Sequence, residues 1–288
     1  MKKLVKQFEV LNWASLFLKK HNCEPTIAKI LLRYHLRLTE SEFYMMMHEA
    51  VSAETVSQFK ADIIKHVKTG IPVQHLTGYE YFYGRKFIVN EHVLIPRPET
   101  EELVQHVIGL AKTEMGAESN VNIIDIGTGS GVIAITLALE LPNTNVFAVD
   151  ISQEALVIAK KNAQIHQANV SFFHGNYLQP IIHKKIKADY IVSNPPYIKQ
   201  SEKSSLATTV KDFDPALALF ANEEGLEAYQ KIIKMVPKVI TSNSKVVFEI
   251  GYDQGSSVCH LIKNQFPQSS VKVIQDINGL DRIVSTQL

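Results

Sequence analysis

The chain has 288 residues, of which 45% are hydrophobic and 20% are charged, and its formal net charge is +1. This composition is ordinary for a soluble globular protein, and the length favours two domains, a small one and one of about 200 residues. The near-neutral charge argues against a protein whose main partner is the phosphate backbone of a long duplex. Residues 1–75 are nevertheless modestly basic, with 11 basic and 7 acidic side chains.

The two cysteines, Cys23 and Cys259, lie far apart and have no metal-ligand spacing. We therefore expect neither a disulfide framework nor a metal site, and a cytoplasmic location fits best. The first residues are basic but lack a long apolar stretch followed by a cleavage site, so we expect no secretion signal. No window approaches the roughly 18 uninterrupted apolar residues that a membrane span needs.

Helical spacing of apolar residues dominates up to about residue 70. Pro25 suits the first turn of a helix, Thr39 suits an N-cap, and Gly70 with Pro72 marks an end. We expect helices at residues 10–20, 24–38, 41–50 and 54–68, and hence an all-helical domain over residues 1–72.

A different pattern follows Pro72. Residues 79–84 and 85–90 alternate in the manner of two strands and meet at Gly84, which predicts a β-hairpin. Two prolines then stiffen the chain, and a helix is expected from Glu99 towards Lys112. Residues 73–98 are therefore interpreted as a linker with structure of its own.

From residue 121 onwards, short apolar runs alternate with helical patterns. Hydrophobic strands separated by helices favour a parallel sheet covered on both faces. The last two runs follow each other without a helix, so the final strand is expected to enter antiparallel. Residues 99–288 thus form an α/β domain, doubly wound and mainly parallel, whose seven expected strands are residues 121–127, 145–150, 170–175, 188–194, 245–251, 271–276 and 281–287.

A glycine-rich turn follows the first of these strands, and Asp150 ends the second. Glycines permit positive φ and a close approach of a ligand to the backbone, at the sheet edge where doubly wound folds bind ligands. Asp150 is placed to accept hydrogen bonds from a ribose diol. The candidate cofactor-binding residues of the turn are Gly127, Thr128, Gly129, Ser130 and Gly131.

The spacing of the glycines bears on the ligand. The third comes one residue too soon for the dinucleotide fingerprint, and the pattern suits S-adenosylmethionine, which has no pyrophosphate. An NAD site is the runner-up, and a merely tight strand-helix turn is the third reading. Asn176 and Tyr177 follow the third strand, where an amide and a ring suit an adenine or an ordinary turn.

The fourth strand ends abruptly in Asn194, Pro195, Pro196 and Tyr197. Consecutive prolines lack amide hydrogens and stiffen the turn. The carboxamide oxygen of Asn194 and the backbone carbonyl between the prolines can accept hydrogen bonds from one planar NH₂ group, on which Tyr197 can stack. This arrangement favours methyl transfer to a conjugated nitrogen, so these four residues are the catalytic and substrate-binding candidates, with Asn194 also next to the donor.

From about Pro72 to its end the chain resembles the release factor glutamine N5-methyltransferases, which methylate the glutamine of the Gly-Gly-Gln motif in peptide chain release factors. Asn-Pro-Pro-Tyr alone is shared with DNA adenine and other amine methyltransferases, whereas IPRPETE joined to it is far more specific. The resemblance lies in PVQHLTG, VLIPRPETEELV, DIGTGSG, SNPPYI, DPALALFANEEGLEAY, FEIGYDQG and DINGLDR.

The resemblance implies a fold and a set of roles. Residues 1–72 would help to recognise the release factor, residues 73–98 would form a hairpin linker, and residues 99–288 would form a class I methyltransferase domain. The glycine turn, Asp150 and Tyr177 would hold S-adenosylmethionine, and Asn194 to Tyr197 would hold the glutamine. Neither a nucleic acid nor a membrane is expected as a partner.

Three positions depart from the family pattern, and a few others stay open. His75 stands where many relatives have an aromatic residue, Asn176 where an acid is common, and Asp214 where glutamate is usual. Arg97 and Glu99 either brace the entrance of the site or form a local ion pair, and Glu249 lies at the ligand edge or serves a turn. The histidines, including His166 and His174, show no metal spacing.

Two other functions share some of these features. An amine methyltransferase acting on DNA or RNA would use the same Asn-Pro-Pro-Tyr turn, but the near-neutral charge and the lack of a large basic domain argue against it. A donor-binding interaction module without catalysis is the third reading, and the intact glycine turn, Asp150 and Asn-Pro-Pro-Tyr turn argue against it.

Overall fold

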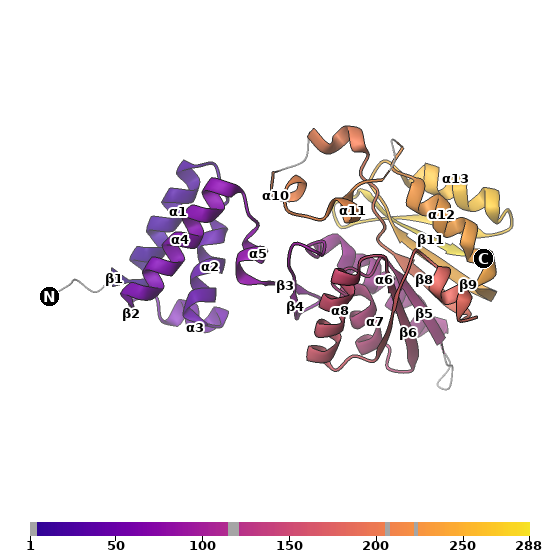
Figure 1. The fold of residues 1–288 in the computed structure, drawn as a ribbon, viewed down its shortest axis with the longest axis horizontal. Helices are drawn as coiled ribbons and strands as arrows, with labels where there is room; N and C mark the ends of the chain where they lie inside the picture. Colours follow the sequence, from indigo (N-terminus) through magenta and orange to yellow (C-terminus); the bar gives the residue numbers. More distant parts are fainter. Residues whose placement is uncertain (1–4, 115–120, 205–207, 222–223) are drawn as a thin grey trace. The chain divides into compact units, whose positions relative to one another are not determined.

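The computed structural model describes residues 5–114, 121–204, 208–221 and 224–288 (Figure 1). The chain forms two compact units, residues 1–78 with 208–213 and residues 79–207 with 214–288. The hairpin therefore packs with the second unit. The three-part division at residues 72 and 98 stays a prediction.

The first unit is built from helices around one apolar core. Buried residues recur at helical spacing, such as Val10, Ala14 and Leu18 on the first helix, so each helix turns one apolar face inward. Its elements are β1 (Val5–Lys6), α1 (Gln7–Lys20), α2 (Thr26–Leu36), α3 (Glu40–Met45), β2 (Ala50–Val51), α4 (Ala53–Thr69), α5 (Val73–Thr77) and α10 (Thr208–Lys211).

The helix expected at residues 41–50 is wrong in its second half. Thr39 caps α3 as predicted, but the helix ends at Met45 and β2 pairs antiparallel with β1. The carbonyls of Met47 and Glu49 accept hydrogen bonds from the first amides of α1, which have no partner within their own helix. Long-range hydrogen bonds thus replace the last turn, and this unit is not purely helical.

The predicted hairpin and the helix after it are confirmed. Strands β3 (Tyr79–Phe82) and β4 (Arg85–Ile88) pair antiparallel across Tyr83 and Gly84, which both have positive φ. Such a two-residue turn matches the twist of the strands. Helix α6 (Pro98–Glu114) begins one residue before the expected Glu99.

The second unit contains the predicted sheet of seven strands. Their order is β10-β11-β9-β8-β5-β6-β7, and all neighbours are parallel except β11, which runs antiparallel between β9 and β10. The expectation for the final strand is therefore confirmed. The strands are β5 (Val121–Ile126), β6 (Thr144–Asp150), β7 (Val170–His174), β8 (Ala188–Ser193), β9 (Ile240–Glu249), β10 (Ser270–Gln275) and β11 (Asp281–Gln287).

Helices cover both faces of this sheet (Figure 1). Ile123 packs with α6 and α7 on one face, and its neighbour Ile124 packs with α12 and α13 on the other. This alternation explains why the strands are apolar along their whole length. The helices of this unit after α6 are α7 (Val132–Glu140), α8 (Gln153–His166), α9 (Gln179–His183), α11 (Ala216–Leu219), α12 (Glu227–Met235) and α13 (Gly255–Gln265), with 3₁₀ turns at Gln200–Ser204 and Val236–Lys238.

None of the helices in the described part of the chain is both long and apolar enough to cross a membrane.

Candidate active site

The glycine turn connects β5 to α7 at the carboxyl edge of the sheet. Gly127, Gly129 and Gly131 have φ of 73°, 55° and 85°, a region that side chains disfavour. At Gly131 a Cβ atom would also lie 2.8 Å from Cδ1 of Ile135 and 3.2 Å from Cβ of Ala159. At Gly127 and Gly129 the same position is open, so their backbone is free to meet a ligand.

The buried carboxyl group of Asp125 stabilises this turn. Oδ2 of Asp125 accepts hydrogen bonds from Oγ1 of Thr128 at 2.6 Å and from the amide of Ala134 at 3.2 Å. Burial raises the pKa of Asp125 to about 7. Ser130 is buried as well, and its carbonyl accepts a hydrogen bond from Nδ2 of Asn162 at 2.9 Å. The turn is thus fixed from several directions.

Asp150, at the end of β6, is joined to the glycine turn. Its Oδ2 accepts a hydrogen bond from the amide of Gly129 and its Oδ1 one from the amide of Ser152, both at 2.8 Å. Burial raises the pKa of Asp150. Ser152 in turn caps α8, because its Oγ accepts from the amide of Ala155 at 3.0 Å. The Asp150 carboxylate is therefore held in one orientation.

Asn194, which follows β8, is connected to two distant residues. Its Nδ2 donates to Oγ1 of Thr100 at 3.2 Å, and this hydroxyl donates to Oε2 of Glu249 at 2.7 Å. Burial raises the pKa of Glu249 to about 7, although the hydrogen bond from Thr100 lowers it. Glu249 therefore ends β9 at the carboxyl edge of the sheet, where its side chain accepts from Thr100.

Tyr197 is the last residue of the Asn-Pro-Pro-Tyr turn, and Gln254 holds its backbone. Its carbonyl accepts a hydrogen bond from Nε2 of Gln254 at 3.2 Å, and the same nitrogen reaches the carbonyl of Gly225 at 3.2 Å. The ring packs against the core between the sheet and α12. Burial raises the pKa of the Tyr197 hydroxyl to about 12, so this group stays protonated near neutral pH.

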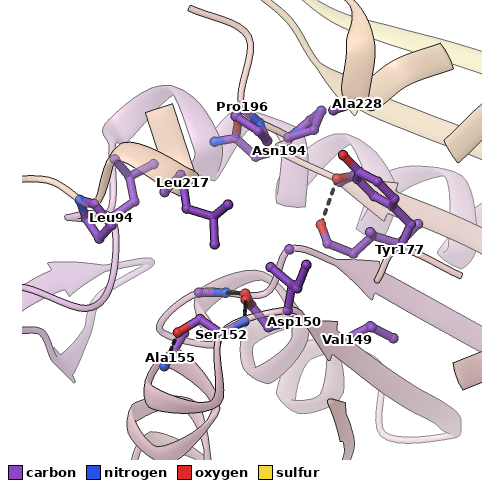
Figure 2. Close-up of a pocket in the computed structure, with 18 of the residues that line it drawn as sticks. Leu94, Val149, Asp150, Ser152, Ala155, Tyr177, Asn194, Pro196, Leu217 and Ala228 are labelled. Atoms are coloured by element: carbon purple, nitrogen blue, oxygen red, sulfur yellow. Dashed lines mark hydrogen bonds between the residues drawn. The ribbon is translucent and has the colours of Figure 1, made fainter. Parts of the chain in front are cut away.

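A cavity of about 430 Å³ lies at this edge, within the size range of small-molecule sites. In Figure 2, Asn194 and Pro196 lie across the cavity from Asp150 and Ser152, with Tyr177 to one side. Eight of the residues predicted from the sequence line it, namely Gly127, Gly129, Asp150, Asn176, Tyr177, Asn194, Pro195 and Pro196.

The other predicted residues are near the cavity without lining it. Thr128 and Ser130 are buried and hold the glycine turn, while Gly131 is the N-cap of α7. Tyr197 is not among the lining residues, and its ring packs against the core between the sheet and α12. Their roles towards a ligand stay predictions.

The cavity also contains residues to which the sequence analysis gave no role. Leu94 faces it from a loop and Leu217 from the short helix α11 (Figure 2), and α12 contributes Glu227 and Lys231, whose side chains pair at 2.5 Å. The segment DPALALFANEEGLEAY, of which residues 222–223 lie outside the described residues, holds seven of the lining residues, namely Pro215, Leu217, Ala218, Phe220, Ala221, Glu227 and Ala228. It was noted as part of a resemblance, but its spacing alone did not indicate a ligand.

Arg97 forms an ion pair with Asp214, at 2.7 Å between Nη2 and Oδ2. The amide of Ile95 also approaches Oδ1 of Asp214, at 3.5 Å. Asp214 is directly followed by Pro215, and both Pro215 and Leu217 line the cavity. The pair thus links the segment before α6 to one wall of the cavity, which agrees with a bracing role for Arg97.

Over the ranges that the structure describes, no three His, Cys, Asp or Glu side chains are arranged to hold a metal ion.

Known structures share the fold of this chain. A methyltransferase from Pyrococcus furiosus covers 80% of the chain and 98% of its own, with 18% identity and a TM-score of 0.50. The hMettl16 catalytic domain, solved in complex with the MAT2A 3′UTR hairpin 1, covers 81% of the chain and 80% of its own, with 15% identity and a TM-score of 0.53. At such identities the likeness concerns the fold alone.

Sequence relatives are much closer. Residues 109–217 match the family described as Methyltransferase small domain, and residues 9–78 match the PrmC N-terminal domain. The release factor glutamine methyltransferase of Bacillus cereus is 43% identical, with 98% of this chain and 99% of the relative covered. That of Bacillus subtilis is 43% identical over 96% of both chains, and that of Staphylococcus aureus is 40% identical over 98% and 99%. The chain therefore belongs to the release factor glutamine methyltransferase family.

Proposed function

We propose that this methyltransferase transfers a methyl group from S-adenosylmethionine to N5 of the glutamine in the Gly-Gly-Gln motif of peptide chain release factors. The observation that carries the proposal is the cavity, in which Asp150 and the glycine turn face Asn194, Pro195 and Pro196. The names of the relatives that share 40–43% of this sequence support the substrate.

The residues on the sheet edge fit S-adenosylmethionine. The open backbone at Gly127 and Gly129 gives room for the amino acid part of the donor, and the Asp150 carboxylate suits the ribose diol. Tyr177 offers a ring beside the adenine. When bound, the donor supplies a methyl group on a positively charged sulfur.

The residues opposite fit a carboxamide. The Oδ1 atom of Asn194 and the carbonyl of Pro195 would accept the two N–H bonds of the glutamine NH₂ group, and Tyr197 would stack on its plane. Acceptors on both hydrogens favour the positive charge that develops on nitrogen as the new N–C bond forms and the C–S bond breaks. The excess proton then leaves to solvent, so the step needs no dedicated base.

The helical unit is the proposed recognition domain for the release factor. The modestly basic residues 1–75 and the match of residues 9–78 to a domain of this family support that role. Both cysteines are free thiols, which suits the cytoplasm as the place of the reaction.

One experiment tests the proposal. The protein is incubated with methyl-labelled S-adenosylmethionine and, in parallel, with a bacterial release factor, duplex DNA or tRNA. We expect label in the release factor alone, and its loss when the Gly-Gly-Gln glutamine is changed to alanine. Label only in nucleic acid would instead assign the site to a nucleobase amine, and donor binding without any transfer would leave a binding module.

A further inference from the structure

We propose that Thr100 and Glu249 are positioning residues, which hold the Asn194 carboxamide so that its oxygen faces the cavity. The inference rests on the proposed function, because it assigns the acceptor that would grip the substrate NH₂ group. Its basis is a chain of two hydrogen bonds, from Asn194 to Thr100 and from Thr100 to Glu249.

The direction of the chain follows from the single hydrogen of a hydroxyl group. While Glu249 is ionised, Thr100 donates that hydrogen to its carboxylate at 2.7 Å, so towards Asn194 the Thr100 oxygen can only accept. Asn194 must then present its NH₂ end, at 3.2 Å. The two ends of a carboxamide have the same shape, and only such partners decide which one faces which way.

The surroundings make the opposite orientation unfavourable. Thr100 is 4% exposed and Glu249 is 1% exposed, so water has little access to their polar atoms. A flipped Asn194 would place its oxygen against the Thr100 oxygen, and two acceptors without a hydrogen between them would be buried together.

The cavity lies on the other side of Asn194. Asn194 lines the cavity, whereas Thr100 and Glu249 are not among its lining residues. With its NH₂ end turned to Thr100, the carboxamide leaves its oxygen for the cavity. Such an oxygen accepts from an NH₂ group, and it repels a carboxylate, which has no hydrogen to donate.

Both positioning residues are anchored by their own backbones. The amide of Thr100 donates to the carbonyl of Arg97 at 3.1 Å, in the first turn of α6. The carbonyl of Glu249 accepts from the buried hydroxyl of Tyr229 at 2.9 Å, and Glu249 is paired with Ile283 of β11. The orientation of Asn194 is thus set by the sheet and by α6, not by the proline turn alone.

A matched pair of variants tests the inference. Thr100→Ser keeps the hydroxyl, whereas Thr100→Val keeps the shape and removes it. We expect kcat with release factor to fall about tenfold in Thr100→Val and to stay within about threefold of wild type in Thr100→Ser. The Kd for S-adenosylmethionine should stay close to wild type in both. The Tm of Thr100→Val should fall by only a few degrees, because buried Glu249 loses one hydrogen bond, so that intact donor binding separates positioning from damage to the fold.

A second measurement does not depend on activity. In ¹⁵N-labelled protein, the side-chain NH₂ signals of Asn194 are assigned by their absence in Asn194→Ala, and their exchange with solvent is followed. We expect slow exchange in wild type and Thr100→Ser and at least tenfold faster exchange in Thr100→Val. Equal exchange in the two Thr100 variants, or equal kcat, would overturn the inference. If wild type fails to methylate release factors, the proposed function fails while the exchange rates still decide the orientation.

Discussion

The cavity has two walls that are held in different ways. We call the glycine turn with Asp150 the donor wall, and Asn194 with Pro195 and Pro196 the wall opposite. On the donor wall, Thr128 bonds to a residue three positions away and Gly129 to one 21 positions away, all within one strand-turn-helix-strand segment. On the wall opposite, Asn194 reaches Thr100 across 94 positions, and Thr100 reaches Glu249 across 149. A local motif therefore describes the first wall, whereas the second exists only once α6, β8 and β9 have come together.

The largest effect is expected from Asn194→Ala, which removes the acceptor but leaves the donor wall intact. By analogy with the loss of one preorganised polar group in other active sites, kcat should fall about 10²- to 10³-fold. The Kd for S-adenosylmethionine, measured by calorimetric titration, should change less than about threefold. Near-full transfer by this variant would contradict the proposed grip on the glutamine.

Glu249→Gln should remove the part of the pH dependence of the free energy of unfolding that Glu249 causes. The pKa of Glu249 is raised from 4.5 to about 7 by burial, so the folded state binds this proton more tightly than the unfolded state. Wild-type stability gains from this group at low pH, and the gain is lost as pH rises from about 4.5 to about 7. Relative to wild type, the variant should therefore become more stable by about 3 kcal/mol over that range.

Urea unfolding at several pH values between 4.5 and 8 measures this difference. Asp125 is present in both proteins, so its own raised pKa cancels. Glu154→Gln is the control, because the pKa of the exposed Glu154 carboxyl is lowered, chiefly by its own backbone amide, which is the opposite direction from Glu249. A constant difference between Glu249→Gln and wild type would mean that Glu249 titrates as an ordinary glutamate.

On the donor wall, Asp150→Asn should weaken the binding of S-adenosylmethionine about tenfold. The carboxylate accepts from two backbone amides, of Gly129 and Ser152. A carboxamide has one accepting oxygen, so its NH₂ group would face one of these amides and leave it unpaired. The charge that suits the ribose is lost as well.

Asp189→Asn is the matched control for this prediction. Asp189 accepts from the amide of Asn122 at 2.8 Å, near the opposite ends of β8 and β5 from the cavity. Calorimetric titration should show an unchanged Kd for this control. A similar loss of affinity in both variants would mean that Asp150 acts through the stability of the sheet.

The same contrast explains how much of the molecule the sequence predicted. The strands that lead to the glycine turn, to Asp150 and to Asn194 are recognisable in the sequence as apolar runs. Parallel strands bring their carboxyl ends to one edge of the sheet, so these residues were expected to lie together. The sheet, the hairpin and the cavity-lining members of these motifs were predicted for that reason. The spacing of apolar residues indicates whether a segment is a strand or a helix, but not which distant residues that segment contacts.

What was missed depends on contacts that no periodicity encodes. The end of α3 at Met45 depends on hydrogen bonds from α1 to residues 47 and 49. The partner of Arg97 is Asp214 and not its neighbour Glu99, which only the folded chain brings into contact. Glu227 and Lys231 look like an ordinary solvated pair on a helix, and only the position of α12 makes them part of the cavity.

The smallest effect is expected at Arg97, whose partner Asp214 directly precedes lining residues of the cavity. Its side chain is 38% exposed and that of Asp214 is fully buried, so the pair is partly screened and Arg97→Gln should cost about 1 kcal/mol of stability. Because Asp214 precedes Pro215 and Leu217, the loss should reach the donor cavity as a two- to fivefold weaker Kd, with kcat at saturating donor unchanged. Arg97→Lys, which keeps the charge without the planar fork, should lie between wild type and Arg97→Gln. If Arg97→Gln lowered kcat as strongly as Asn194→Ala, Arg97 would belong to the wall that grips the glutamine, and the division between a local donor wall and a long-range acceptor wall would have to be redrawn.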